Sequence, residues 1–134
     1  MRRAARMLAA CALAVLAAGC GPKPGTPRAQ PVPVRVTNHN RADVVVYLVR
    51  GGNTLRLGTV VTGETRVLPI RNVPIQQLQG VQFDVRRIGV ESAPFRTRAV
   101  SLGPEQMVTL TIEDLLTTSQ ISVAENPAPE KMRP

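Results

Sequence analysis

Side chains able to act as nucleophiles, general bases or metal ligands are scarce in this chain of 134 residues. Its cysteines are Cys11 and Cys20, and its single histidine is His39. A zinc site needs three or four Cys, His or carboxylate ligands, and a nucleophile–histidine pair would have to recruit His39 from a predicted turn. The one carboxylate doublet, Glu113 and Asp114, lies at a predicted strand end, where neighbouring side chains point to opposite faces. These observations argue against an enzyme, a metal site and a bound cofactor.

The first 20 residues have the pattern of an export signal. Three arginines at positions 2, 3 and 6 precede a uniformly apolar segment, Met7 to Ala18. A helix of that length rises about 18 Å, which is short of the ~30 Å hydrocarbon core of a bilayer. The segment therefore indicates a signal peptide over residues 1–19 rather than a membrane span.

Residues 16–20, with the sequence Leu-Ala-Ala-Gly-Cys, resemble the lipobox of bacterial lipoprotein precursors. In that family, small residues precede a cysteine whose thiol is diacylated before the signal is cleaved. The resemblance implies cleavage between Gly19 and Cys20 and a lipid anchor on Cys20, although Ala17 stands where leucine is commonest. The alternative is an ordinary secretory signal that leaves Cys20 as a plain thiol. As the only cysteine of the mature chain, Cys20 would then have no partner within the chain in an oxidising compartment.

The residue after the lipobox cysteine bears on location. Gly21 stands there, whereas in enterobacterial members of the family an aspartate at that position retains the protein in the inner membrane. The resemblance therefore implies anchoring in the outer membrane, on its periplasmic side. That compartment argues against a nucleic-acid partner despite the formal net charge of +8. The three aromatic residues, Tyr47, Phe83 and Phe95, also offer little for bases to stack on.

Proline-rich segments flank the central part of the chain. Residues 20–33 hold five of the 12 prolines, a composition typical of an extended tether of about 40 Å at ~3.1 Å per residue. Residues 124–134 combine prolines with charges of both signs and are predicted to be a disordered tail. A single folded domain is expected over residues 34–123.

The central domain alternates apolar and polar residues with a period of two and has frequent turn residues. Strands are predicted near residues 32–36, 43–50, 54–60, 65–70, 81–86, 95–102, 107–113 and 120–123, with single helical turns near 75–78 and 114–118. Along one strand, Val81, Phe83 and Val85 should point inward. The resulting prediction is an all-β fold, a small antiparallel β-sandwich of about seven to eight strands, with a small β-barrel as the alternative. The segment Val46–Val60 is also similar to a hairpin of small bacterial lipoproteins, a likeness that implies no activity.

Arginine is the one side chain that recurs in a pattern with a possible function, since 15 of the 17 basic residues are arginines. Strand alternation places Arg56 and Arg86 outward, with Leu55 and Leu57 inward, and puts Arg96 and Arg98 on one face of a further strand. A shared basic face would suit anionic lipid or an acidic glycan, because guanidinium groups bind phosphate and carboxylate through paired hydrogen bonds. Outward arginines that only protect strands from aggregation are the alternative.

These features together predict a non-catalytic binding, assembly or accessory module of the cell envelope, anchored through Cys20, with an envelope protein as a further partner. The alternative is a lipoprotein that binds a small ligand or a glycan. That function would need a concave aromatic platform, which three dispersed aromatic residues hardly supply.

Overall fold

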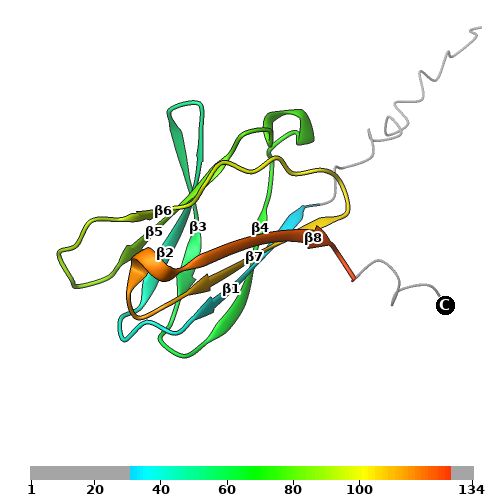
Figure 1. Ribbon diagram of the computed structural model, residues 1–134. Coiled ribbons are helices and arrows are strands. Elements are labelled where there is room, and N and C mark those ends of the chain that lie inside the picture. Colours follow the sequence, from blue (N-terminus) through cyan, green and yellow to red (C-terminus); the bar gives the residue numbers. More distant parts are fainter. Residues whose placement is uncertain (1–30, 128–134) are drawn as a thin grey trace, which may run out of the picture.

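The computed structural model describes residues 31–127, which form eight β-strands and two 3-10 turns (Figure 1). In chain order these are β1 (Val32–Asn38), β2 (Val44–Arg50), β3 (Asn53–Val60), β4 (Thr65–Ile70), η1 (Ile75–Gln77), β5 (Gln82–Arg87), β6 (Phe95–Arg96), β7 (Gln106–Ile112), η2 (Leu116–Thr118) and β8 (Gln120–Glu125). Every strand except β6 begins and ends within two residues of the bounds that the alternation predicts. No helix in this part of the chain is long and apolar enough to cross a membrane.

The strands form two four-stranded sheets. The first sheet has the order β4-β1-β7-β8 and the second has the order β3-β2-β5-β6. All paired neighbours are antiparallel except β1 and β7, which run parallel, so the first sheet is mixed rather than purely antiparallel. The sheets are not closed into a barrel, and the prediction of a small all-β sandwich is confirmed.

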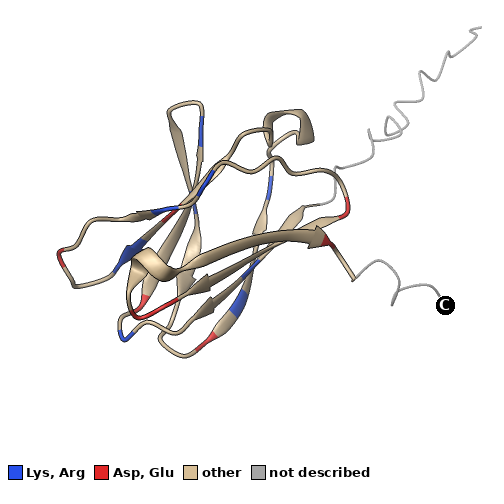
Figure 2. Cartoon of the chain, in the orientation of Figure 1, with Lys and Arg blue, Asp and Glu red and all other residues tan. Residues whose placement is uncertain are grey.

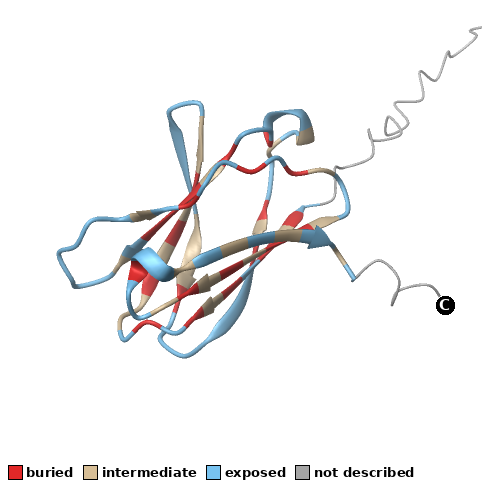
Figure 3. Cartoon of the chain, in the orientation of Figure 1, coloured by how far each residue is buried: buried red, intermediate tan, exposed pale blue. Residues whose placement is uncertain are grey.

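Alternation along the strands turns one face of each sheet into a shared core (Figure 3). Val34 and Val36 of β1 contribute from the first sheet, and both are fully buried. Val81, Phe83 and Val85 contribute from the region of β5 and are also fully buried, as predicted. Phe83 is the largest fully buried side chain, so it is a principal source of the apolar area that stabilises the sandwich.

The prediction of a strand over residues 95–102 is wrong beyond Arg96, because β6 has only two residues. The Thr97 hydroxyl accepts a hydrogen bond from the Phe83 N–H at 3.0 Å, and the Thr97 N–H donates to the Phe83 carbonyl at 2.9 Å. Regular pairing resumes only at the bridge between Val81 and Val100. One extra residue on the β6 side therefore interrupts the ladder, in the manner of a β-bulge.

Two strands extend past the bounds expected for the domain. β1 begins at Val32, two residues before position 34, and Val32 is buried opposite Ile70 of β4. β8 ends at Glu125, two residues after position 123. The part of the proline-rich segment nearest the domain thus contributes to the first sheet.

Two buried asparagines hold the connection between β1 and β2, where the chain crosses from one sheet to the other. The Asn38 side chain donates to the carbonyls of Ala42 and Val60 and accepts from the Asn40 N–H. The Asn40 side chain donates to the carbonyls of Glu113 and Asp114, both at 2.9 Å. Because both amides are satisfied by backbone groups, they stabilise the crossover without leaving an unpaired polar group in the interior.

Candidate functional site

The strand register assembles a row of polar side chains across the outer surface of the second sheet. Tyr47 on β2 lies opposite Arg56 on β3 and opposite Asp84 on β5. Asp84 in turn lies opposite Arg96 on β6. Residues opposite one another point to the same face, and so does Arg86, two positions beyond Asp84. These five residues are called the arginine face here, and Figure 2 shows basic segments on β5 and β6.

A β-bulge places Arg56 in this row. The pairing of β2 with β3 shifts between Val46 and Tyr47, so that Val46 is opposite Gly58 and Tyr47 is opposite Arg56. In an unbroken ladder, Tyr47 would face Leu57 instead. Leu57 is the extra residue, and the bulge exchanges a leucine for a guanidinium group beside the tyrosine.

The bulge also changes the surroundings of the leucines that flank Arg56. Leu57 packs partly buried against the core, whereas Leu55 lies opposite Leu48 near the hairpin tip and is 43% exposed. Leu55 therefore points to the core-facing side of the sheet, as predicted, but it is not buried there. The tip of the hairpin of β2 and β3 projects from the body of the sandwich (Figure 1).

Asp84 is the centre of the arginine face. Its side chain is 1% exposed, and both of its oxygens accept hydrogen bonds from arginine. Arg96 donates from Nε to Oδ1 at 3.2 Å and from Nη2 to Oδ2 at 3.4 Å. Arg86 donates from Nη2 to Oδ2 at 3.1 Å. A buried carboxylate is costly unless it is paired and hydrogen-bonded, and here two cations meet that requirement.

Arg86 makes a second contact that orients it. Its guanidinium carbon lies 4.9 Å from the centroid of the Tyr47 ring, within the range of a cation–π interaction. The Arg86 and Arg96 side chains are each 52% exposed. Each is therefore held on one side by the protein while its outer side faces solvent.

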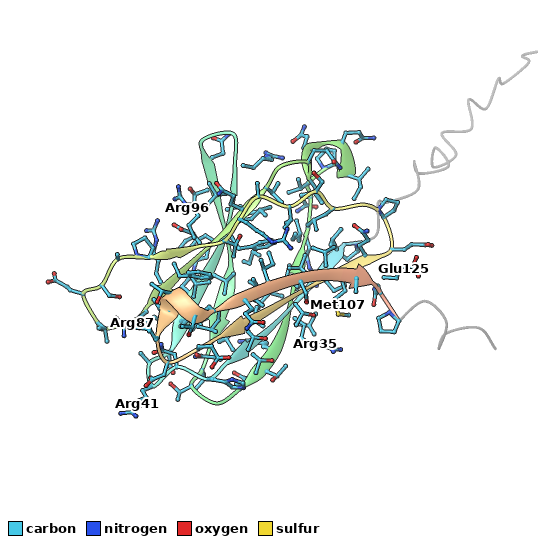
Figure 4. All side chains as sticks on the ribbon, in the orientation of Figure 1. Arg35, Arg41, Arg87, Arg96, Met107 and Glu125 are labelled. Carbon is cyan, nitrogen blue, oxygen red and sulfur yellow. The ribbon has the colours of Figure 1, made fainter. Side chains whose placement is uncertain are left out.

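The structure places three of the four predicted arginines on one face of the second sheet. Arg56 is exposed and donates from Nη2 to the Thr59 hydroxyl at 2.7 Å. Arg98 is also exposed, but it lies beyond β6 in the irregular segment before Val100, outside the row. Figure 4 shows Arg96 projecting from the surface at β6.

The charges on this face do not cancel. Three guanidinium groups, on Arg56, Arg86 and Arg96, accompany the single carboxylate of Asp84, which leaves an excess of two positive charges. The contacts to Asp84 occupy only one edge of Arg86 and of Arg96, so nitrogens of both groups can donate outward to an anion. The arrangement can bind phosphate or carboxylate groups on a flat surface.

Alternation predicts Asp84 and Arg86 as outward residues, but it does not single out Asp84 or Tyr47 as members of a site. The partners of Asp84 include Arg96, on a strand that the chain reaches only after the connection of residues 88–94. One feature of the sequence could have indicated Asp84 as a member of the site: it is an acidic residue between the inward-facing Phe83 and Val85 on a short strand.

The remaining titratable side chains singled out from the sequence form surface pairs. His39 is exposed, and its Nδ1 lies 3.6 Å from Oε2 of Glu113. Arg41 Nε lies 3.3 Å from Oδ2 of Asp114. Within residues 31–127, no three His, Cys, Asp or Glu side chains lie close enough together to hold a metal ion. Gly19 and Cys20, the predicted cleavage and lipidation site, lie outside the described residues.

No protein-family model matches the chain, and no curated protein matches its sequence. Among solved structures, it is similar to a protein from Eubacterium rectale solved by NMR, with 13% identity and a TM-score of 0.43, over 78% of this chain and 98% of that one. A second similarity is to the sugar-binding protein pneumolysin, with 8% identity and a TM-score of 0.37 over 73% of this chain. This chain spans only 24% of the length of the pneumolysin chain. At these TM-scores neither similarity bears on function.

Proposed function

We propose that the protein is a non-catalytic lipoprotein of the cell envelope, whose arginine face binds an anionic membrane surface. The observation that supports the binding is the placement of Arg56, Arg86 and Arg96 on one face of the second sheet, where the buried Asp84 carboxylate holds Arg86 and Arg96. The anchor on Cys20, and its place on the periplasmic side of the outer membrane, rest on the lipobox resemblance of residues 16–20. Non-catalytic action is supported by the scarcity of nucleophiles and bases in the sequence.

The shape and charge of the face favour a surface over an enclosed ligand. Its members come from four adjacent strands of one sheet, so the guanidinium groups spread along a plane. A basic residue near an anionic bilayer contributes about 1 kcal/mol, and the attraction fades within a Debye length of ~8 Å at physiological salt. Two excess charges therefore give weak binding, which becomes effective when an anchor holds the domain close to the membrane.

Vesicle co-sedimentation tests the arginine face. A chain of residues 31–127 should bind vesicles that contain phosphatidylglycerol at low salt, should not bind phosphatidylcholine alone, and should dissociate as salt rises. Arg56→Gln should weaken this binding severalfold. Arg35→Gln is the matched control, because Arg35 is an exposed arginine on β1 of the other sheet. Equal losses from the two substitutions would show that only net charge matters and would contradict a specific face. Binding to an acidic glycan but not to the vesicles would assign the face to a polymer.

Processing of the precursor tests the anchor. Cys20→Ala should leave the uncleaved precursor, because cleavage in lipoproteins follows acylation of that thiol. Cys11→Ala should be processed normally, since Cys11 lies within the signal segment. Mass spectrometry of the mature chain should show acyl chains on Cys20. An unmodified Cys20 thiol on a protein that washes from membranes would overturn the anchor.

A further inference from the structure

The sandwich has four edge strands, and three of them are protected against pairing with another strand. These edges are β4 and β8 in the first sheet and β3 and β6 in the second. β3 carries the bulge at Leu57 and the charge of Arg56, and β6 has only two residues. β4 contains Pro69. Bulges, charges, prolines and short strands are the devices by which natural sheets prevent edge-to-edge association.

The proline of β4 lies where it blocks the open edge. The Asn38 N–H donates to the Glu64 carbonyl at 2.9 Å, which identifies these two residues as a hydrogen-bonded pair. Hydrogen-bonded and non-hydrogen-bonded pairs alternate along an antiparallel ladder. In this register the backbone nitrogen at position 69 points away from β1, and proline leaves no donor there.

β8 has no bulge and no proline, and over residues 120–124 it carries no charge. It pairs with β7 in continuous register over six residues, without a bulge or a proline. Its one charged residue is Glu125 at the end of the strand, as Figures 2 and 4 show. Ile121 and Val123 are half-buried toward the core, whereas Ser122 on the outer face is exposed.

The free hydrogen-bonding groups of β8 can be assigned. The Asn126 N–H donates to the Glu105 carbonyl at 2.6 Å, so this pair is hydrogen-bonded at the end of the ladder of β7 and β8. Alternation then directs the N–H and C=O groups of Ile121, Val123 and Glu125 away from β7. The edge offers three donors and three acceptors at regular spacing.

From this edge we infer that two copies of the protein associate through β8, antiparallel about a two-fold axis, to form one eight-stranded sheet. Ser122 lies opposite Ser122 of the second copy, and Ile121 lies opposite Val123 of the second copy. This register keeps apolar side chains on the core side and pairs the two half-buried aliphatics with each other. It also forms four backbone hydrogen bonds, from Ile121 and Val123 of each copy.

The charges of β8 favour a second copy in this register. The two Glu125 side chains lie at opposite ends of the paired strands, six residues apart along the strand axis. At ~3.4 Å per residue this is about 20 Å, more than twice the Debye length of ~8 Å at physiological salt. Two-fold pairing is the commonest symmetry of protein oligomers, and one strand pair is a small interface. The dimer is therefore weak and depends on concentration.

Disulfide trapping tests the pairing directly. Ser122 and its counterpart form a non-hydrogen-bonded pair with Cα atoms about 4.5 Å apart, within the usual disulfide range of ~4.4–6.8 Å. In the full chain with Cys11→Ala and Cys20→Ala, Ser122→Cys should form a covalent dimer under mild oxidation in a detergent extract. Thr109→Cys is the matched control, because Thr109 lies opposite Ser122 on β7. Its two copies would be three strand spacings of ~4.8 Å apart, or about 14 Å, and should not cross-link.

Analytical ultracentrifugation of the same full chain without an added cysteine should show a reversible dimer. Ser122→Lys should shift it to monomer, because two ammonium groups would face each other across the axis. Thr54→Lys, which adds the same charge to the exposed part of edge strand β3, should leave the dimer unchanged. A monomer at all concentrations, equal cross-linking at positions 122 and 109, or a dimer unaffected by Ser122→Lys would each overturn the pairing through β8.

Discussion

Asp84→Asn is the substitution that most directly tests how the arginine face is built. Asparagine has nearly the volume of aspartate, so the change removes the charge without creating a cavity. The carboxylate is 1% exposed and accepts three hydrogen bonds, two from Arg96 and one from Arg86. Without the charge, both guanidinium groups lose their counter-ion, and the amide that replaces the carboxylate must turn a donor toward one of them.

The expected loss follows from these contacts. A hydrogen bond to a charged group contributes about 1.5–3 kcal/mol. Three such bonds therefore set an upper limit on the loss of unfolding free energy, and the loss that we expect is well below this limit. The Arg86 and Arg96 side chains are each 52% exposed, so water replaces part of the hydrogen bonding that each guanidinium group loses. Asparagine also keeps one carbonyl acceptor. We therefore expect the free energy of unfolding to fall by about 2 kcal/mol. At about 4–8 °C per kcal/mol for a domain near 100 residues, the Tm should fall by roughly 8–16 °C.

Urea unfolding followed by circular dichroism measures this loss. Asp114→Asn is the matched control, because it removes a carboxylate from the exposed pair with Arg41 and should cost under about 0.5 kcal/mol. A double-mutant cycle of Asp84→Asn with Arg96→Gln should give a coupling energy of about 1 kcal/mol or more. If Asp84→Asn is as mild as Asp114→Asn, or if the cycle shows no coupling, the carboxylate does not hold the arginines in place.

Three further substitutions or truncations test the fold. Phe83→Ala should lower the free energy of unfolding by about 3–5 kcal/mol in a denaturant titration, whereas Gln82→Ala should lower it by about 1 kcal/mol at most. Similar losses from the two substitutions would contradict the inward assignment of Phe83. Asn40→Asp should lower the free energy of unfolding by at least about 2 kcal/mol, because it presents a carboxylate to two carbonyl groups. In the same titration, Asn53→Asp in the exposed hairpin should leave the stability nearly unchanged. A chain of residues 31–127 should unfold cooperatively in calorimetry, since both sheets and the core lie within it, and a broad transition would show that a flanking segment contributes to the packing.

Most strands could be predicted because each lies across the boundary between core and surface. A strand with one buried face must alternate, and the run from Val81 to Arg86 does so without exception. Turn residues then separate the runs: Gly51 and Gly52 have φ of 50° and 84°, values that other residues rarely adopt, and they form the predicted hairpin turn. The position of a strand in the sequence, and the side chains that it turns toward the core, are therefore local properties of the sequence.

Strand order is not local. β1 lies beside β4 and β7, and its parallel pairing joins Val34 to Val108, far away in the chain. Nothing in either strand specifies that partner, because many aliphatic strands offer equivalent faces. The truncation of β6 also depends on such a contact, since the Thr97 hydroxyl replaces a backbone group only after β5 lies beside it.

The arginine face shows where the same limit applies to function. Alternation assigns Arg56, Arg86 and Arg96 to outward faces one strand at a time, but only the pairing of four strands brings them together. Arg86 and Arg96 lie on the neighbouring strands β5 and β6, and Arg56 lies on β3 beyond β2, so the three cations on this face repel one another. An arginine that only keeps a strand soluble would be best placed apart from the others in water. The Asp84 carboxylate fixes Arg86 and Arg96 at one position on the sheet, although its burial carries a cost of desolvation. Asp84 therefore holds two of the three cations at defined positions on the outer face of the second sheet, and the anionic partner that we propose for this face is what the vesicle assay tests.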